Sequence, residues 1–262
     1  MVQQMIDIIK ITKKPSLLVL DAFFAVSDPF LMAQDFFIDG QRMLHLIIKA
    51  KINYVGFKLK ENGEKEKVKL KKIFSKKADE FKTEKLYVYG KKTKISYYTM
   101  NLYWQPIDGW LRFVWVKDGD DKFILMCSDL EMPAEKIIKA YGLRFKIEVS
   151  FKFLKHIIGA FSYHFWSKAL PKLKSKTSSI NLANITDKKA QKIIAKSATA
   201  IERFVNLGCV ALGILQIIAI KSPKSIWKQY SGWLRTKSSI IPSEKTTQNV
   251  IKSRYYQPPS DI

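Results

Sequence analysis

The chain has 262 residues, of which 46 are Lys or Arg and 23 are Asp or Glu, so its formal net charge at pH 7 is +23. Hydrophobic residues make up 47% of the sequence and aromatic residues 13%, which is enough apolar surface for a folded core and excludes a disordered basic tail. Two cysteines and three histidines exclude a disulfide framework and a four-cysteine zinc site, and they do not favour a catalytic zinc site.

The excess of positive charge indicates a polyanionic partner. We expect nucleic acid rather than a membrane surface, because no long amphipathic basic helix stands out. A coding bias would explain why only six of the 46 basic residues are Arg, but it does not explain the shortage of acidic residues.

The longest apolar stretch, residues 204–220, is shorter than the ~20 residues of a spanning helix, so we predict a buried helix. With no signal-peptide pattern, we expect a cytoplasmic, nucleoid-associated protein.

The first fifty residues alternate between helical and strand patterns. Residues 2–13 have the pattern of the end of a helix, and residues 16–21 form an apolar run that predicts a buried strand ending in Asp21. A cap residue followed by Pro29 starts a helix over residues 30–38, which Asp39 and Gly40 end. Residues 43–48 predict a second buried strand, so the layout is α/β.

Short alternating runs and turn signals then follow between residues 53 and 118, and they predict an antiparallel β block inserted in the α/β domain. Residues 49–94 hold sixteen lysines and six acidic residues interleaved with aromatic residues. This mixture suits contacts to a nucleic-acid backbone combined with base stacking. A sheet with one solvated lysine face explains it equally well.

The second half of the chain is predicted to be mainly helical. After a buried strand at residues 123–127, Ser128 and Glu131 have the spacing of a capping box, and a long helix is expected over residues 134–158. A polar, Lys-rich connector follows at residues 168–189. Helices are predicted at residues 190–220 and 225–234, and the tail after residue 239 shows little periodicity.

Four side chains of the long predicted helix carry the strongest chemical signal. Tyr141, Arg144, Glu148 and Lys155 fall within a narrow sector of one face at ~100° per residue. A carboxylate can hold Mg²⁺, Arg can grip a phosphate with two hydrogen bonds, and Lys adds a point charge. The alternative is a solvated face with an Arg–Glu pair four residues apart.

This spacing resembles the Y-R-E-K signature of insertion-sequence transposases of the DDE, RNase H-like class. The segments at residues 17–24, 43–51, 124–130, 137–148 and 163–166 agree with the same family, and the resemblance covers about residues 16–234. It implies DNA cleavage and strand transfer by two Asp and one Glu that bind two Mg²⁺ or Mn²⁺ ions. It also implies that a homodimer acts on paired double-stranded DNA ends.

The resemblance leaves two candidates for the family's second Asp, Asp21 and Asp129. Glu148 matches the family Glu, and Tyr141, Arg144 and Lys155 match the residues that hold DNA. Asp21 is followed by a helix, a strand and the β insertion, as the family's second Asp is. Asp129 follows the insertion and is explained as a helix cap. We therefore expect Asp21 and Glu148 to be the catalytic, metal-binding residues.

The family's first Asp lies upstream of the second, and only twenty residues precede Asp21. The resemblance thus predicts an N-terminally truncated transposase that is a poor enzyme by itself. Its expected parts are a partial RNase H-like core (1–52), a β-rich insertion (53–120), the last core strand with the signature helix (121–166), a basic linker (167–189) and a helical C-terminal region (190–262). Two alternatives stay open: a non-catalytic DNA-binding or dimerising remnant, and an unrelated basic protein of RNA or membrane surfaces.

Overall fold

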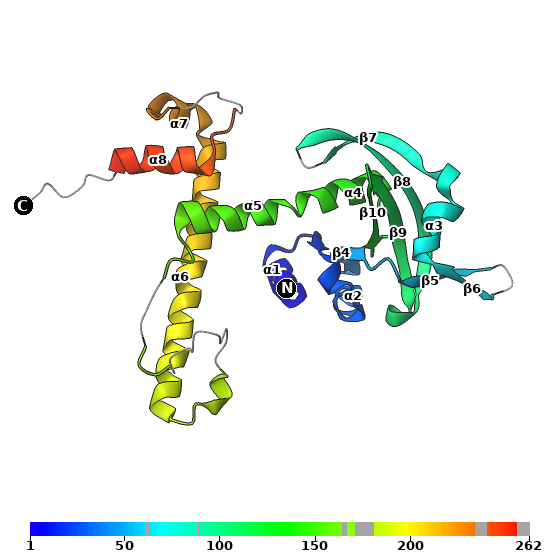
Figure 1. The fold of residues 1–262 in the computed structure, drawn as a ribbon, viewed down its shortest axis with the longest axis horizontal. Coiled ribbons are helices and arrows are strands. Elements are labelled where there is room, and N and C mark those ends of the chain that lie inside the picture. Colours follow the sequence, from blue (N-terminus) through cyan, green and yellow to red (C-terminus); the bar gives the residue numbers. More distant parts are fainter. Residues whose placement is uncertain (61–62, 89, 164–166, 171–180, 234–239, 256–262) are drawn as a thin grey trace, which may run out of the picture. The chain divides into compact units, whose positions relative to one another are not determined.

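The computed structural model describes residues 1–60, 63–88, 90–163, 167–170, 181–233 and 240–255. The chain divides into two compact units, Met1–Lys146 and Ile147–Ile262, and each is considered by itself (Figure 1). The first unit holds all the described strands, and the second is helical. The chain is therefore a mixed α/β protein with a helical C-terminal region, as the sequence predicts at this level.

The first unit is built on one mixed sheet of eight strands. They are β1 (Ser16–Leu20), β4 (Leu44–Ala50), β5 (Val55–Leu59), β6 (Lys65–Lys69), β7 (Lys82–Val88), β8 (Lys91–Trp104), β9 (Gly109–Asp118) and β10 (Asp121–Cys127). Their order is β1-β4-β10-β9-β8-β5-β6, with β7 also paired to β8. Only β1 and β4 run parallel among the pairs of this sheet. The strands predicted as an antiparallel insertion thus extend the same sheet that contains β1 and β4.

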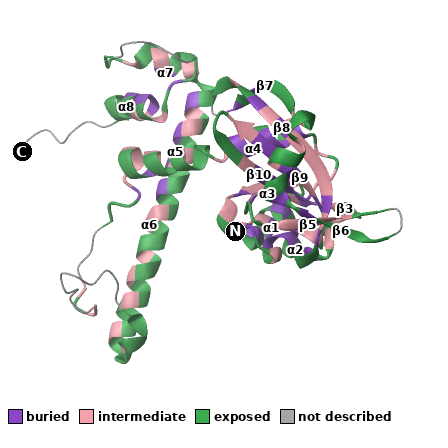
Figure 2. Cartoon of the chain, turned by 45° about the vertical axis from the view of Figure 1, so that its right-hand side comes forward, coloured by how far each residue is buried: buried purple, intermediate pink, exposed green. Residues whose placement is uncertain are grey.

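Helices cover the two faces of this sheet. α1 (Val2–Thr12), α2 (Ser27–Gln34) and α3 (Leu70–Lys76) bury their apolar side chains in a core with Leu46 and Ile48 of β4. α4 (Ala134–Leu143) packs on the opposite face, where Ile47 of the same strand meets Ile137. Neighbouring residues of β4 therefore point to different helical layers, as the two-residue period of a strand requires. In Figure 2, the buried residues of this unit, drawn in purple, lie on the strands and on parts of the helices that pack against them.

The helix predicted over residues 30–38 is shorter than expected. α2 ends at Gln34, and Phe37–Ile38 (β2) pairs with Gln41–Arg42 (β3) in a small hairpin. Asp39 and Gly40 form its turn with φ of 50° and 75°, which is the left-handed geometry that two-residue hairpin turns require. The sequence predicts that the Asp-Gly pair ends a helix, but the pair forms a hairpin turn instead.

The single helix predicted over residues 134–158 is wrong, because three segments replace it. α4 ends at Leu143, α5 spans Lys146–Phe153, and Leu154–Ile158 (η4) has π-helical bonding. Gly142 weakens the last turn of α4, and the β-branched and aromatic residues of α5 have low helix propensity. No described residue of α5 is buried, so packing does not compensate. The constant 100° per residue that placed four side chains on one face does not hold across these breaks.

The second unit is dominated by α6 (Lys188–Lys221), followed by α7 (Pro223–Gln229) and α8 (Glu244–Tyr255). The predicted helix at 190–220 is confirmed by α6, and the one at 225–234 is confirmed only as far as Gln229, because the described residues 230–233 are not helical. α8 was missed. α6 is not the buried helix expected, because Leu207, Val210, Ile214 and Ile217 are each more than half exposed. By length and apolar composition it could cross a membrane, a test that core helices of soluble proteins also pass. Of the predicted linker and the segment at 163–166, residues 171–180 and 164–166 lie outside the described residues, as do residues 234–239.

Candidate nucleic-acid interface

The carboxyl ends of β1 and β4 define one edge of the sheet. Because the two strands are parallel and Leu20 pairs with Ile48, Asp21 and Lys49 follow at the same edge. β10 runs antiparallel to β4, so its first residues, Asp121–Phe123, also lie there. The C-terminal end of α4 reaches this edge and brings Tyr141, which packs against Phe123.

A pocket of about 260 Å³ lies at this edge, within the first unit. Its charged lining consists of Lys49, Lys122 and Arg144 with one carboxylate, Asp121. The Arg144 guanidinium lies 5.8 Å from the ring centre of Tyr141, and the Lys49 ammonium lies 5.6 Å from that of Phe123. Three cations against one carboxylate make the pocket positive, and an Arg with lysines beside it is the donor set that binds phosphate groups.

Tyr141 has a structural position that the sequence did not indicate. Its side chain is only 9% exposed, and its ring lies 6.0 Å from that of Phe123, centre to centre. The ring therefore joins α4 to β10 and places Arg144 one turn further along. Lys49 and Lys122 were not singled out, although the alternation of β4 puts Lys49 on the same face as Ile47, the face that α4 covers.

Asp21 ends β1 as predicted, and its carboxylate also has a local role. Its Oδ1 accepts a hydrogen bond of 2.9 Å from the N–H of Phe23 and caps the short 3₁₀ turn Ala22–Phe24 (η1). Asp21 is half-buried. This bond engages one carboxylate oxygen, which is compatible with a metal bound through the other.

Asp129, the rejected alternative, caps a turn rather than a helix. Its Oδ1 accepts from the N–H groups of Glu131 and Met132 at 3.0 and 3.2 Å. The capping box predicted here does not form, because Ser128 instead accepts from the Leu46 N–H at 2.9 Å and α4 begins only at Ala134. These hydrogen bonds from the turn backbone thus explain the position of the Asp129 carboxylate without a metal ion.

Glu148 and Lys155 belong to the second unit, whereas Asp21, Tyr141 and Arg144 belong to the first. Glu148 lies in the first turn of α5 and Lys155 in the π-helical segment, and both are exposed. Within the described ranges, no three side chains of the His, Cys, Asp and Glu types gather as a set that could hold a metal ion. The structure thus brings two of the five predicted site residues, Tyr141 and Arg144, into one pocket.

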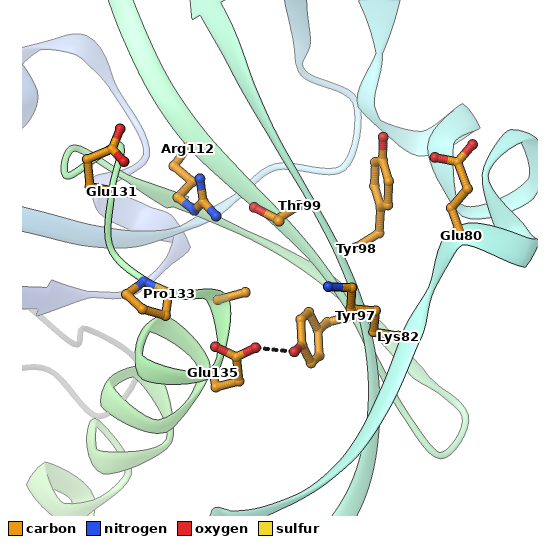
Figure 3. Close-up of a pocket in the computed structure, with 10 residues that line it drawn as sticks. Glu80, Lys82, Tyr97, Tyr98, Thr99, Arg112, Glu131, Pro133 and Glu135 are labelled. Atoms are coloured by element: carbon orange, nitrogen blue, oxygen red, sulfur yellow. Dashed lines mark hydrogen bonds between the residues drawn. The ribbon is translucent and has the colours of Figure 1, made fainter.

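A larger pocket of about 540 Å³ lies elsewhere in the first unit and has charges of both signs (Figure 3). The Tyr97 hydroxyl lies between two carboxylates, 2.8 Å from Glu84 and in hydrogen-bond contact with Glu135. Burial raises the pKa of Tyr97, and its hydrogen bond lowers the pKa of Glu135. Since carboxylates outnumber cations in its lining, this pocket suits a polyanion less well than the pocket at Arg144.

No known family model matches this chain, and no curated protein matches it significantly. The residues and geometry of the sheet edge are thus what supports a functional proposal.

The Tyr97–Glu135 bond predicts a pH-dependent contribution to stability. A carboxyl group with a lowered pKa in the folded state stabilises the fold above its unfolded pKa of about 4.3, and this contribution is lost as the pH falls through the folded pKa. The stability difference between wild type and Tyr97→Phe should therefore be larger at pH 7 than at pH 3, as measured by urea unfolding. Tyr87→Phe, on the exposed side of β7, should show no such difference. An equal loss for Tyr97→Phe at both pH values contradicts the assignment.

Proposed function

We propose that this chain is part of a DDE transposase with an RNase H-like core, which cuts and joins the DNA of an insertion sequence. The observation that carries the proposal is the positive pocket at the carboxyl edge of the sheet. That pocket contains Tyr141 and Arg144 of the Y-R-E-K pattern and lies at the edge where Asp21 ends β1. Its setting in the cytoplasm, associated with the nucleoid, belongs to the same proposal.

Double-stranded DNA is the proposed partner because the pocket and the whole chain are positive. Arg144 can donate two hydrogen bonds to a phosphate, and Lys49 and Lys122 surround it with further charge. Lys155 is exposed and is a further predicted contact to the DNA backbone. Contacts of this type position DNA without reading its sequence.

Asp21 and Glu148 are the proposed ligands of Mg²⁺ or Mn²⁺. One Asp21 oxygen is engaged by the Phe23 N–H, so this carboxylate fits a ligand that binds the ion through one oxygen. When bound, a pair of such ions activates the attacking oxygen and stabilises the leaving oxygen of a phosphodiester. A third carboxylate, the family's first Asp, is not assigned to any residue of this chain.

β1 is an edge strand of the described sheet. β1 pairs with β4 on one side and with no other strand in the described part of the chain. A strand edge of this kind is able to pair with a further strand. An RNase H-like core would place its first strands, and its first Asp, beside this edge, so we expect little strand transfer from the chain alone.

A second candidate function is that of a DNA-binding and dimerising protein without strand chemistry. Leu207, Val210, Ile214 and Ile217 of α6 are exposed at alternating spacings of three and four residues, the pattern of a helix–helix seam. This candidate needs the seam and the basic pocket, but it does not need Asp21 or Glu148.

The DNA-binding part of the proposal is tested at the pocket. Lys49→Gln and Arg144→Gln should each weaken binding to duplex DNA several-fold and make the salt dependence shallower by about one unit, because each removes one phosphate contact. Fluorescence anisotropy over a range of salt concentrations measures both effects. Lys139→Gln, an exposed charge on α4, is the matched control. Equal effects of all three substitutions would argue against the pocket.

The catalytic part is tested by Mg²⁺-dependent strand transfer. The chain alone should give little product. Addition of the polypeptide encoded immediately upstream of Met1 should restore activity if that polypeptide carries the first Asp. Asp21→Asn or Glu148→Gln should then reduce the rate by at least about a hundredfold, since each removes a metal-binding carboxylate.

Asp129→Asn is the matched control for these substitutions, because Asp129 also follows a strand, and its effect should be small. Activity that survives Glu148→Gln, or that is lost with Asp129→Asn alone, refutes the assignment. DNA binding with no strand transfer under any of these conditions supports the second candidate.

A further inference from the structure

A second basic surface lies at the opposite end of the sheet order, where the edge strand β6 meets α3 (Figure 1). It is a groove of about 570 Å³ in the first unit. Six lysines line it: Lys58, Lys67, Lys69, Lys72, Lys76 and Lys77. Among the described residues, Glu66 is the only acidic residue in this lining, and the remaining lining residues, Val68 and Ile73, are buried.

The local fold explains why these lysines converge. β6 is the last strand of the sheet, and α3 begins at Leu70, directly after its end. Leu70 and Ile73 anchor one side of α3 in the core, and the buried Trp115 indole donates a 2.9 Å hydrogen bond to the Leu70 carbonyl. Lys69, the last residue of β6, and Lys72 and Lys76 of α3 are spaced three and four residues apart, so they gather beside one another, and all three are exposed.

Most of these lysines have no ion-pair partner within the described ranges. Lys77 pairs with Glu80, and Lys58 lies opposite Glu66 in the β5–β6 pairing. Among the described residues, Lys67, Lys69, Lys72 and Lys76 form no ion pair. Like charges three or four residues apart repel one another on a helix, and a concave lysine surface concentrates positive potential. A bound polyanion would relieve this repulsion.

The chemistry of the lining selects among polyanions. In the part of the chain that the structure describes, this lining contains no aromatic side chain, so it offers no stacking platform for the bases of a single strand. Its described residues also include no Arg, Asn or Gln, the residues that read base edges with paired hydrogen bonds. Its two aliphatic residues are buried and cannot insert into a lipid surface. What remains is a row of ammonium groups, which contact phosphates as point charges.

We propose that the groove between β6 and α3 binds the sugar–phosphate backbone of duplex DNA without reading its sequence. The surface is separate from the pocket at Arg144, with which it shares no lining residue. The assignment goes beyond the proposed function, because it holds whether or not the chain cuts DNA. For this groove, the proposal keeps the backbone contacts predicted for the lysine-rich residues 49–94 and drops the predicted base stacking.

The test is the salt dependence of DNA binding by the full chain carrying Lys69→Gln, Lys72→Gln and Lys76→Gln together. These side chains are exposed, so the fold should be retained, which circular dichroism checks. Binding to a duplex of about 30 base pairs of arbitrary sequence is measured by anisotropy between about 50 and 200 mM NaCl. Loss of three phosphate contacts should make the slope of log K against log salt shallower by about 2.7 and weaken binding at least about tenfold.

The matched control removes the same charge elsewhere: Lys10→Gln, Lys13→Gln and Lys14→Gln, at α1 and just after it. Its slope should stay close to that of wild type. An equal change in both triple variants would mean that net charge alone acts, and it would overturn the assignment. The same holds if the groove variant loses binding to single-stranded DNA or to phosphatidylserine vesicles more strongly than to the duplex. Arg144→Gln leaves the groove intact and changes only the pocket at the other site. If Arg144→Gln weakens DNA binding and the triple groove variant does not, the groove assignment fails while the proposed function stands.

Discussion

The arrangement of the first unit depends on the pairing of β10 with β4. The register sets Ile124 opposite Ala50 and Met126 opposite Ile48, and on its other side β10 pairs with β9. One strand thereby joins the parallel pair near the N-terminus to the antiparallel strands that follow. The same pairing places the start of β10 beside the end of β4, and α4 follows β10 along the chain. The pocket that holds Arg144 is a direct consequence of this connection.

The surfaces of the first unit differ in their balance of cationic and acidic side chains. The pocket at Arg144 has three cations and one carboxylate, whereas the larger pocket around Tyr97 has more carboxylates than cations. The groove between β6 and α3 has six lysines and one carboxylate. Two surfaces of this unit therefore carry positive charge without a balancing number of acidic groups. Two separate contacts along a DNA backbone would hold it in a defined direction, which one charged site does not achieve.

Most strands of the large sheet were predictable because turn signals and a two-residue period are local properties, but β6 was not predicted. Where tertiary packing decides, the sequence was a poorer guide. Asp39 and Gly40 end a helix or turn a hairpin equally well, and only the pairing of β2 with β3 selects the hairpin. α8 is mostly polar and was missed, because its buried residues, such as Thr247, gain their environment only from neighbouring helices.

The candidate site was predictable to a similar extent. Spacing along one helix singled out Tyr141 and Arg144, which do share a pocket. Lys49 and Lys122 come from other strands and reach that pocket only through the β4–β10 pairing, which no local pattern records.

The proposed DNA interface is tested most directly by the rate at which an amine-reactive reagent modifies each lysine, with and without saturating duplex DNA. DNA should slow the modification of Lys49 and Lys122 severalfold and leave Lys10 and Lys13 unchanged. Unaltered rates at Lys49 and Lys122 while DNA is bound would contradict an interface at the carboxyl edge of the sheet.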